Sequence, residues 1–141
     1  MFKPKVLFVC TGNSCRSQIA EGIMRDKAGD HYEVFSAGSH PSRVNPMAIK
    51  VMDEWGIDIS YHTSDSVNIY LDKEIDIVIT VCDHANQICP AFPGDVERIH
   101  WSIKDPFIGW DAGDEHLDAF RETRETVCER IEKFLKSRKD E

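Results

Sequence analysis

Two residues that could perform chemistry together, Cys10 and Arg16, lie six positions apart in the segment "CTGNSCR". A thiolate is a strong nucleophile, and the planar guanidinium of an arginine can hold two oxygens of a tetrahedral oxyanion. Gly12 and Asn13, between them, are residue types that tolerate the left-handed backbone of a tight loop. The pattern predicts a loop that binds an oxyanion beside a nucleophilic cysteine. The alternative is a buried cysteine at a strand end and an unrelated surface arginine.

Phosphatase chemistry at such a loop also needs an acid that protonates the leaving oxygen. Asp105, in the segment "KDPF", is the candidate, because it follows a predicted strand and precedes the stiff Pro106. An aspartate before a proline is also a common turn residue, which is the alternative interpretation.

Two further cysteines, Cys82 and Cys89, favour redox chemistry over simple hydrolysis. A phosphatase needs one nucleophilic cysteine, whereas several cysteines near one oxyanion site can pass a disulfide from pair to pair. If residues 83–88 form a helix, Cys82 and Cys89 lie about 10 Å apart along its axis. A disulfide allows a Cα separation of only roughly 4.4–6.8 Å. We therefore expect this segment to unwind if the two cysteines pair.

The elements that position these residues alternate between strand and helix. Apolar runs predict strands over Lys5–Cys10, Tyr32–Gly38, Ile75–Cys82 and Val96–Trp101. Amphipathic patterns and caps predict helices from about Ser14, from Asn45–Pro46 to Gly56, and from near Asp114. This alternation indicates an α/β fold, a single domain over residues 1–141 whose parallel sheet has helices on both faces. Cys10, Cys82 and Asp105 then share the carboxyl edge of the sheet, where open parallel sheets bind ligands.

Composition and charge argue against several classes of protein. The chain has 141 residues, 41% of them hydrophobic and 30% charged, which is ordinary for one folded domain. Its formal net charge of -8 argues against binding to nucleic acid or to an anionic membrane. No apolar stretch approaches the roughly 20 residues that span a bilayer, and the first residues do not form a secretory signal. We expect a cytoplasmic monomer whose cysteines are mostly reduced.

Several segments together resemble the thioredoxin-coupled arsenate reductases, the cytoplasmic, arsenic-detoxifying branch of the low-molecular-weight tyrosine phosphatase fold. These segments are "VCTGNSCRSQIAEG", "SAG", "GIDIS", "TSD", "VCDHANQICP", "HW" and "DP". The resemblance runs from about Val6 to Phe134 and implies a four-stranded parallel sheet flanked by helices. Ser17-Gln18 in place of the phosphatases' usual serine-proline, together with Cys82 and Cys89, favours the reductases.

The resemblance implies a role for each motif residue. Arsenate, with phosphate or sulfate as mimics, is expected on the backbone N–H groups of Thr11, Gly12, Asn13, Ser14, Cys15 and Arg16, with the Arg16 side chain holding its oxygens. Cys10 is expected to attack arsenic, and Asp105 to protonate the departing oxygen. Ser17 is expected to donate a hydrogen bond to the Cys10 thiolate. Cys82 and then Cys89 would take over the disulfide, which thioredoxin would reduce.

No cofactor is required by this scheme, but the resemblance implies that a potassium ion can bind beside the loop. The matching positions are Asn13, Glu21, Ser36, Thr63 and Asp65. Hard oxygen ligands suit such an ion, and each of these residues could equally serve in turns and caps. Scattered cysteines without a Cys-x-x-Cys pair argue against zinc.

Three classes of function therefore remain open. The first is a redox enzyme that reduces arsenate, and the second is a phosphatase in which Cys82 and Cys89 protect or regulate the site. The third is a non-catalytic module that binds anions or senses redox state. We expect Cys15 to be a small side chain that fills the loop and Cys128 to belong to the core. His62 is expected to be a solvated or hydrogen-bonded surface histidine.

Overall fold

The central strand is the most completely buried part of the sheet. In the computed structural model, which describes residues 3–107 and 117–139, β1 (Lys5–Cys10) is buried from Val6 onward. It pairs in parallel with β2 (Glu33–Gly38) on one side and β3 (Ile77–Thr80) on the other. β4 (Glu97–His100) pairs in parallel with β3, so the strand order is β2-β1-β3-β4. Burial on both faces explains why β1 is a continuous apolar run.

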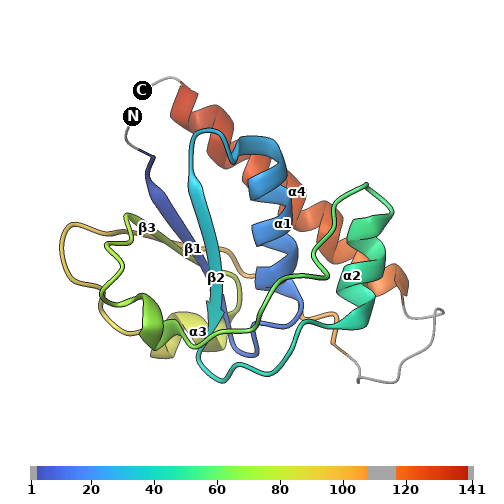
Figure 1. The fold of residues 1–141 in the computed structure, drawn as a ribbon, viewed down its shortest axis with the longest axis horizontal. Helices are drawn as coiled ribbons and strands as arrows, with labels where there is room; N and C mark the ends of the chain where they lie inside the picture. The colour runs from blue at the N-terminus through green and yellow to red at the C-terminus, as the bar shows by residue number, and fades with distance from the viewer. Residues whose placement is uncertain (1–2, 108–116, 140–141) are drawn as a thin grey trace.

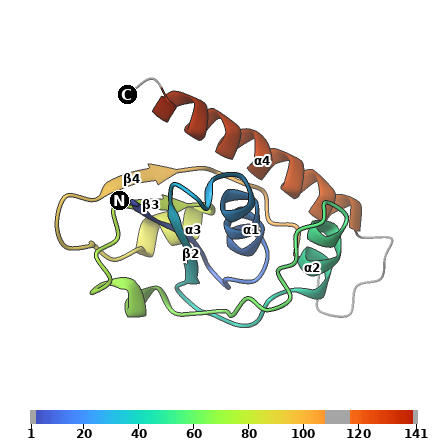
Figure 2. The same ribbon diagram turned by 45° about the horizontal axis from the view of Figure 1, so that its top comes forward.

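Helices cover both faces of this sheet (Figure 1). They are α1 (Arg16–Ala28), α2 (Pro46–Asp53), α3 (Asp83–Ile88) and α4 (Leu117–Lys139), with a short 3₁₀ helix, η1, over Val67–Tyr70. α1 and α3 connect neighbouring strands in opposite directions across the sheet, so right-handed crossovers place them on opposite faces. α4 packs against α1 and α2 (Figure 2). None of the helices in the described residues is both long and apolar enough to cross a membrane.

The predicted fold is confirmed: an α/β architecture with a four-stranded parallel sheet and helices on both faces. The predicted bounds of the third strand, Ile75–Cys82, are wrong at both ends, partly because Cys82 leaves the strand to cap α3. The first helix begins at Arg16 rather than near Ser14, with Cys15 as its N-cap residue and Asn13 at a positive φ of 47° in the loop before it. The predicted start of the last helix, near Asp114, lies outside the described residues.

Gly22 lies inside α1, where a Cβ atom would lie 2.8 Å from Cγ2 of the fully buried Ile59. Alanine is favoured over glycine within a helix by roughly 0.8–1.0 kcal/mol, but overpacking a core costs about 1–3 kcal/mol. We therefore expect Gly22→Ala to lower the free energy of unfolding by roughly 1 kcal/mol in urea denaturation. In an Ile59→Ala background the same change should be neutral or stabilising, because the clashing atom is gone. A stabilised single variant would contradict this packing.

Candidate active site

The loop between β1 and α1, residues 11–15, is held in place through its carbonyl groups. The segment after β2 donates to three loop carbonyls and to the carbonyl of Cys10, just before the loop, at 2.8–3.2 Å; the pairs are Ser39 N–Cys10 O, His40 N–Thr11 O, Ser42 N–Gly12 O and Asn45 N–Ser14 O. The carbonyl of Asn13 accepts from Nε2 of the buried Gln18 at 3.0 Å. In a trans peptide the N–H points away from the C=O. These bonds therefore turn the N–H groups of residues 11–15 toward the opposite side, where they can bind an anion at the start of α1.

Gly38, the last residue of β2, supports the loop by close approach. A Cβ atom there would lie 2.6 Å from the carbonyl oxygen of Thr11 and 2.9 Å from the nitrogen of Asn13. Backbone atoms cannot yield as a flexible side chain can, so this position requires glycine. The sequence placed Gly38 at the end of a strand and Asn45 at the start of a helix, but it did not predict that Gly38, Gln18 or residues 39–45 contact the loop, because nothing in their local pattern indicates such contacts.

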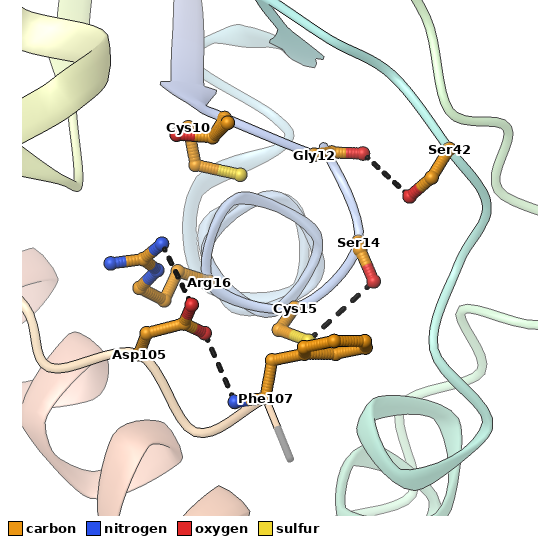
Figure 3. Close-up of a pocket in the computed structure, with 9 residues that line it drawn as sticks. Cys10, Gly12, Ser14, Cys15, Arg16, Ser42, Asp105 and Phe107 are labelled. Carbon is orange, nitrogen blue, oxygen red and sulfur yellow. Dashed lines mark hydrogen bonds and ion pairs between the residues drawn. The ribbon is translucent and has the colours of Figure 1, made fainter. Parts of the chain in front are cut away.

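The loop forms one wall of a cleft of about 260 Å³. Its lining consists of Cys10, Thr11, Gly12, Ser14, Cys15, Arg16, Ser42, Asp105 and Phe107. Figure 3 looks along the axis of α1 and shows the Cys10 sulfur pointing into the space above the helix start. The structure thus brings together the predicted nucleophile, most of the predicted oxyanion loop, the arginine and the candidate acid.

Asn13 and Ser17 lie behind the loop and determine how Cys10 is hydrogen-bonded. The Asn13 amide nitrogen donates to Oγ of Ser17 at 2.8 Å and to Oγ of Ser36 at 3.0 Å. Because the Ser17 oxygen already accepts a hydrogen bond, its own hydrogen is available to the Cys10 sulfur, 2.9 Å away. A hydroxyl hydrogen directed at the sulfur is a donor placed at the predicted nucleophile. This is the contact expected of Ser17, while its catalytic role stays a prediction.

Arg16 and Asp105 form the opposite wall of the cleft. Nη1 of Arg16 donates to the carbonyl of Ile103 at 3.0 Å, and Nη2 lies 3.5 Å from Oδ2 of Asp105. Oδ1 of Asp105 accepts from the backbone nitrogen of Phe107 at 3.0 Å. The Asp105 side chain is 52% exposed and that of Arg16 only 12%. The guanidinium is therefore fixed in the wall of the cleft, whereas the carboxyl lies at its mouth, open to water.

Cys82 and Cys89 flank α3, next to the cleft but outside its lining. Cys82 is buried, and its sulfur lies 3.3 Å from both Oγ1 of Thr11 and the backbone nitrogen of Ala85, so that it caps the helix. Cys89 ends α3 and is half-buried, and burial raises the pKa of its thiol. All five cysteines are free thiols. Cys82 is thus hydrogen-bonded directly to the oxyanion loop, through Thr11, and Cys89 lies at the other end of α3.

The burial of three other residues, Cys15, Cys128 and His62, can be compared with what the sequence predicted. Cys15 is 4% exposed, and burial raises the pKa of its thiol to about 12, as suits a side chain that fills the loop. Cys128 is half-buried at the edge of the core. The expectation of a surface histidine is wrong for His62, whose side chain is 2% exposed. His62 is hydrogen-bonded, as that expectation allowed, but its partner is Gln18, behind the loop.

Four of the five residues proposed for potassium, Glu21, Ser36, Thr63 and Asp65, line a second hollow behind the loop, and Asn13 is hydrogen-bonded to two of them. Ser36 donates to Oε1 of Glu21 at 2.5 Å, and the backbone nitrogen of Asp65 donates to Oδ1 of Asn13 at 2.8 Å. Oγ1 of Thr63 donates to Oδ2 of Asp65 at 2.8 Å. These residues therefore already satisfy part of one another's hydrogen-bonding capacity, and potassium binding stays a prediction.

Comparison with known proteins places this chain in one family. The model of the family described as "Low molecular weight phosphotyrosine protein phosphatase" matches residues 5–141. The arsenate reductase of Halalkalibacterium halodurans is 44% identical over 139 residues, which is 99% of this chain and 100% of that protein. A solved structure, "An arsenate reductase in the phosphate binding state", has a TM-score of 0.76 at 36% identity, covering 95% of this chain and 98% of that one. The Corynebacterium glutamicum thioredoxin-dependent arsenate reductase Cg_ArsC1' has a TM-score of 0.76 at 29% identity, over 96% of this chain and 61% of that one.

The environments of Cys10 and Cys15 predict different reactivity, although both line the cleft. With its pKa raised to about 12, Cys15 is a thiolate in only about one molecule in 10⁴ at pH 8. We expect iodoacetamide at pH 8 to alkylate Cys10 at least about tenfold faster than Cys15 in the folded protein. Phosphate should protect Cys10, and urea should abolish the difference. Peptide mass spectrometry measures both sites, and rapid labelling of Cys15 in the folded protein would contradict its assignment as a buried, neutral thiol.

Proposed function

This chain belongs to the low molecular weight phosphotyrosine protein phosphatase family, and on that premise we propose that it reduces arsenate to arsenite, in arsenic detoxification. Cys10 is the nucleophile of the proposed reaction, Cys82 and Cys89 carry the disulfide, and thioredoxin supplies the electrons. The names of the relatives support arsenate as the substrate. The thioredoxin-dependent C. glutamicum relative supports the donor.

The observation that carries the proposal is the position of Cys82. Its sulfur is hydrogen-bonded to Thr11, the residue that directly follows the nucleophile. Hydrolysis of a phosphate ester requires no second thiol here. A second thiol next to Cys10 is what a reaction needs if the nucleophile is to be released by forming a disulfide.

In the first step of the proposed mechanism, arsenate binds to the N–H groups of residues 11–15 and to Arg16. The Cys10 thiolate, stabilised by the hydroxyl of Ser17, attacks arsenic and forms an S–As bond. Asp105 protonates the departing oxygen, which leaves as water. Asp105 lies beside Arg16 at the mouth of the cleft, so it can collect a new proton from solvent for the next cycle.

In the second step the electrons move from sulfur to arsenic. The Cys82 thiolate attacks the Cys10 sulfur, the S–As bond breaks, and its electron pair stays on arsenic, which leaves as trivalent arsenite. Cys89 then attacks Cys82, which frees Cys10 and forms the Cys82–Cys89 disulfide. The dithiol of thioredoxin reduces that disulfide with two electrons and two protons.

A phosphatase is the second candidate, because the family description and the cleft both fit it. Hydrolysis of an aryl phosphate needs only Cys10, Arg16 and Asp105, and all three line the cleft. Under the reductase proposal this hydrolysis is a side reaction. Under the phosphatase alternative it is the main activity, and Cys89 is dispensable for it.

Cys89→Ser distinguishes the two candidates. Cys10 and Cys82 suffice for the first disulfide, so we expect one arsenite per enzyme in a single turnover. Multiple turnover with thioredoxin, its reductase and NADPH should be lost, because the Cys10–Cys82 disulfide stays buried beside the loop. Aryl phosphate hydrolysis should persist in reducing buffer.

Cys128→Ser, which changes a half-buried cysteine on α4, is the matched control and should turn over normally. Normal turnover by Cys89→Ser would remove Cys89 from the relay.

Asp105→Asn tests the proposed acid. The amide keeps the size and polarity of the side chain but cannot give up a proton to the departing oxygen. We expect the single-turnover rate of arsenite formation to fall by on the order of 10²–10⁴ at saturating arsenate. Asp72→Asn, an exposed aspartate after η1, should have the wild-type rate. A full rate in Asp105→Asn would mean that water or another group supplies the proton.

A further inference from the structure

Arg25 contacts three different groups behind the oxyanion loop. Its Nη2 lies 2.6 Å from Oε2 of Glu21 and donates to the carbonyl of Val34 at 2.7 Å. Nη1 lies 3.1 Å from Nε2 of His62. Glu21 is only 10% exposed, and a carboxylate that is largely buried requires a compensating positive charge. Arg25 supplies that charge from the next turn of the same helix.

A first chain of hydrogen bonds leads from Arg25 to Cys10. Glu21 accepts from the Ser36 hydroxyl at 2.5 Å, and Ser36 in turn accepts from the amide nitrogen of Asn13 at 3.0 Å. The second hydrogen of that amide goes to Ser17, which donates to the Cys10 sulfur. Glu21 can only accept and the amide nitrogen can only donate, which fixes the direction as far as Ser17; the Ser17 hydroxyl donates to the sulfur when Cys10 is a thiolate. The charge pair at one end therefore fixes the donor that faces sulfur at the other.

A second chain leads from Arg25 to the carbonyl of Asn13. Nε2 of Gln18 faces two carbonyls, Asn13 O at 3.0 Å and Thr63 O at 2.9 Å, so the Gln18 oxygen faces Nδ1 of His62 at 2.9 Å. Nδ1 must then carry the hydrogen, which leaves Nε2 to accept from Arg25 if the ring is neutral. Burial lowers the pKa of His62 and favours that neutral ring. The first chain therefore passes through the side chain of Asn13, the loop residue with positive φ, and the second ends on its carbonyl.

The same contacts bear on whether potassium fits here. Both oxygens of Glu21 are engaged, one by Ser36 and the other by Arg25. A potassium ion bound to Glu21 would lie close to the guanidinium, and like charges at short range repel. The guanidinium of Arg25 thus already neutralises the Glu21 carboxylate that a potassium ion would bind.

We infer that Arg25 is the resident cation of this site and a positioning residue for the loop: it neutralises Glu21, orients Asn13 through both chains, and makes a bound potassium ion unnecessary. The inference does not depend on arsenate as the substrate, because it concerns only how the loop and the Cys10 sulfur are held. It would stand equally for a phosphatase.

The experiment compares wild type, Arg25→Met and Arg25→Lys in KCl, NaCl and choline chloride of equal ionic strength. The wild-type melting temperature should differ by less than about 1 °C between the salts, because no site is left for the ion to fill. Arg25→Met should melt about 5 °C lower in choline chloride and recover part of that loss in KCl, where the ion can now reach Glu21. Arg130→Met, which removes an exposed arginine from α4, should behave as wild type.

A second measurement separates positioning from mere stability. The rate of Cys10 alkylation at pH 7 and a temperature where all variants are folded should fall roughly tenfold in Arg25→Met, the size expected when one hydrogen bond to a charged group is weakened. The rate in Arg25→Lys, which keeps the charge without the forked geometry, should lie between those of wild type and Arg25→Met.

A wild-type melting temperature several degrees higher in KCl than in choline chloride would overturn the inference, and this test needs no variant. An unchanged alkylation rate in folded Arg25→Met would equally overturn it.

Discussion

The site depends on one constraint: every carbonyl from Cys10 to Ser14 is bound on the outer side of the loop. Without those five hydrogen bonds, the peptide groups would be free to turn, and the N–H groups would not converge on an anion. The segment after β2 can supply four of the donors only because Gly38 brings the end of that strand against the loop. The parallel order of β1 and β2 is what places the two carboxyl ends side by side. Fold, loop and anion chemistry are thus one connected set of contacts.

Much of this arrangement follows from sequence patterns, for identifiable reasons. Apolar runs and helix caps are local signals, so they predicted the order of the elements, and the rule for parallel sheets then brought Cys10, Cys82 and Asp105 to one edge. The roles of Gln18, Gly38 and Arg25 could not be found in this way. Each acts through a contact with a segment distant in sequence, such as Thr63 for Gln18 and Thr11 for Gly38. The burial of His62 has the same origin, since its partners Gln18 and Arg25 come from α1.

Environment, more than residue type, separates the five chemically identical thiols. Cys10 receives a hydroxyl hydrogen at the wall of an open cleft, while Cys15, on the same cleft, is kept neutral by burial. Cys82 accepts a backbone N–H at the start of a helix, and Cys89 ends that helix half-buried. Cys128 lies on α4, far along the chain from the loop. A count of cysteines therefore says little about function until each sulfur has been placed among its donors.

Under the proposed relay, the short helix between Cys82 and Cys89 links electron transfer to folding thermodynamics. In the dithiol state α3 is formed, whereas a disulfide between its two ends requires it to open. Whatever stabilises α3 therefore raises the reduction potential of the pair, by about 30 mV for each 1.4 kcal/mol. Six residues make only a marginal helix on their own, so the contribution is modest and easily tuned by substitution on its surface. Substitutions on the surface of α3 would in this way change the reduction potential of the pair while both cysteines are kept.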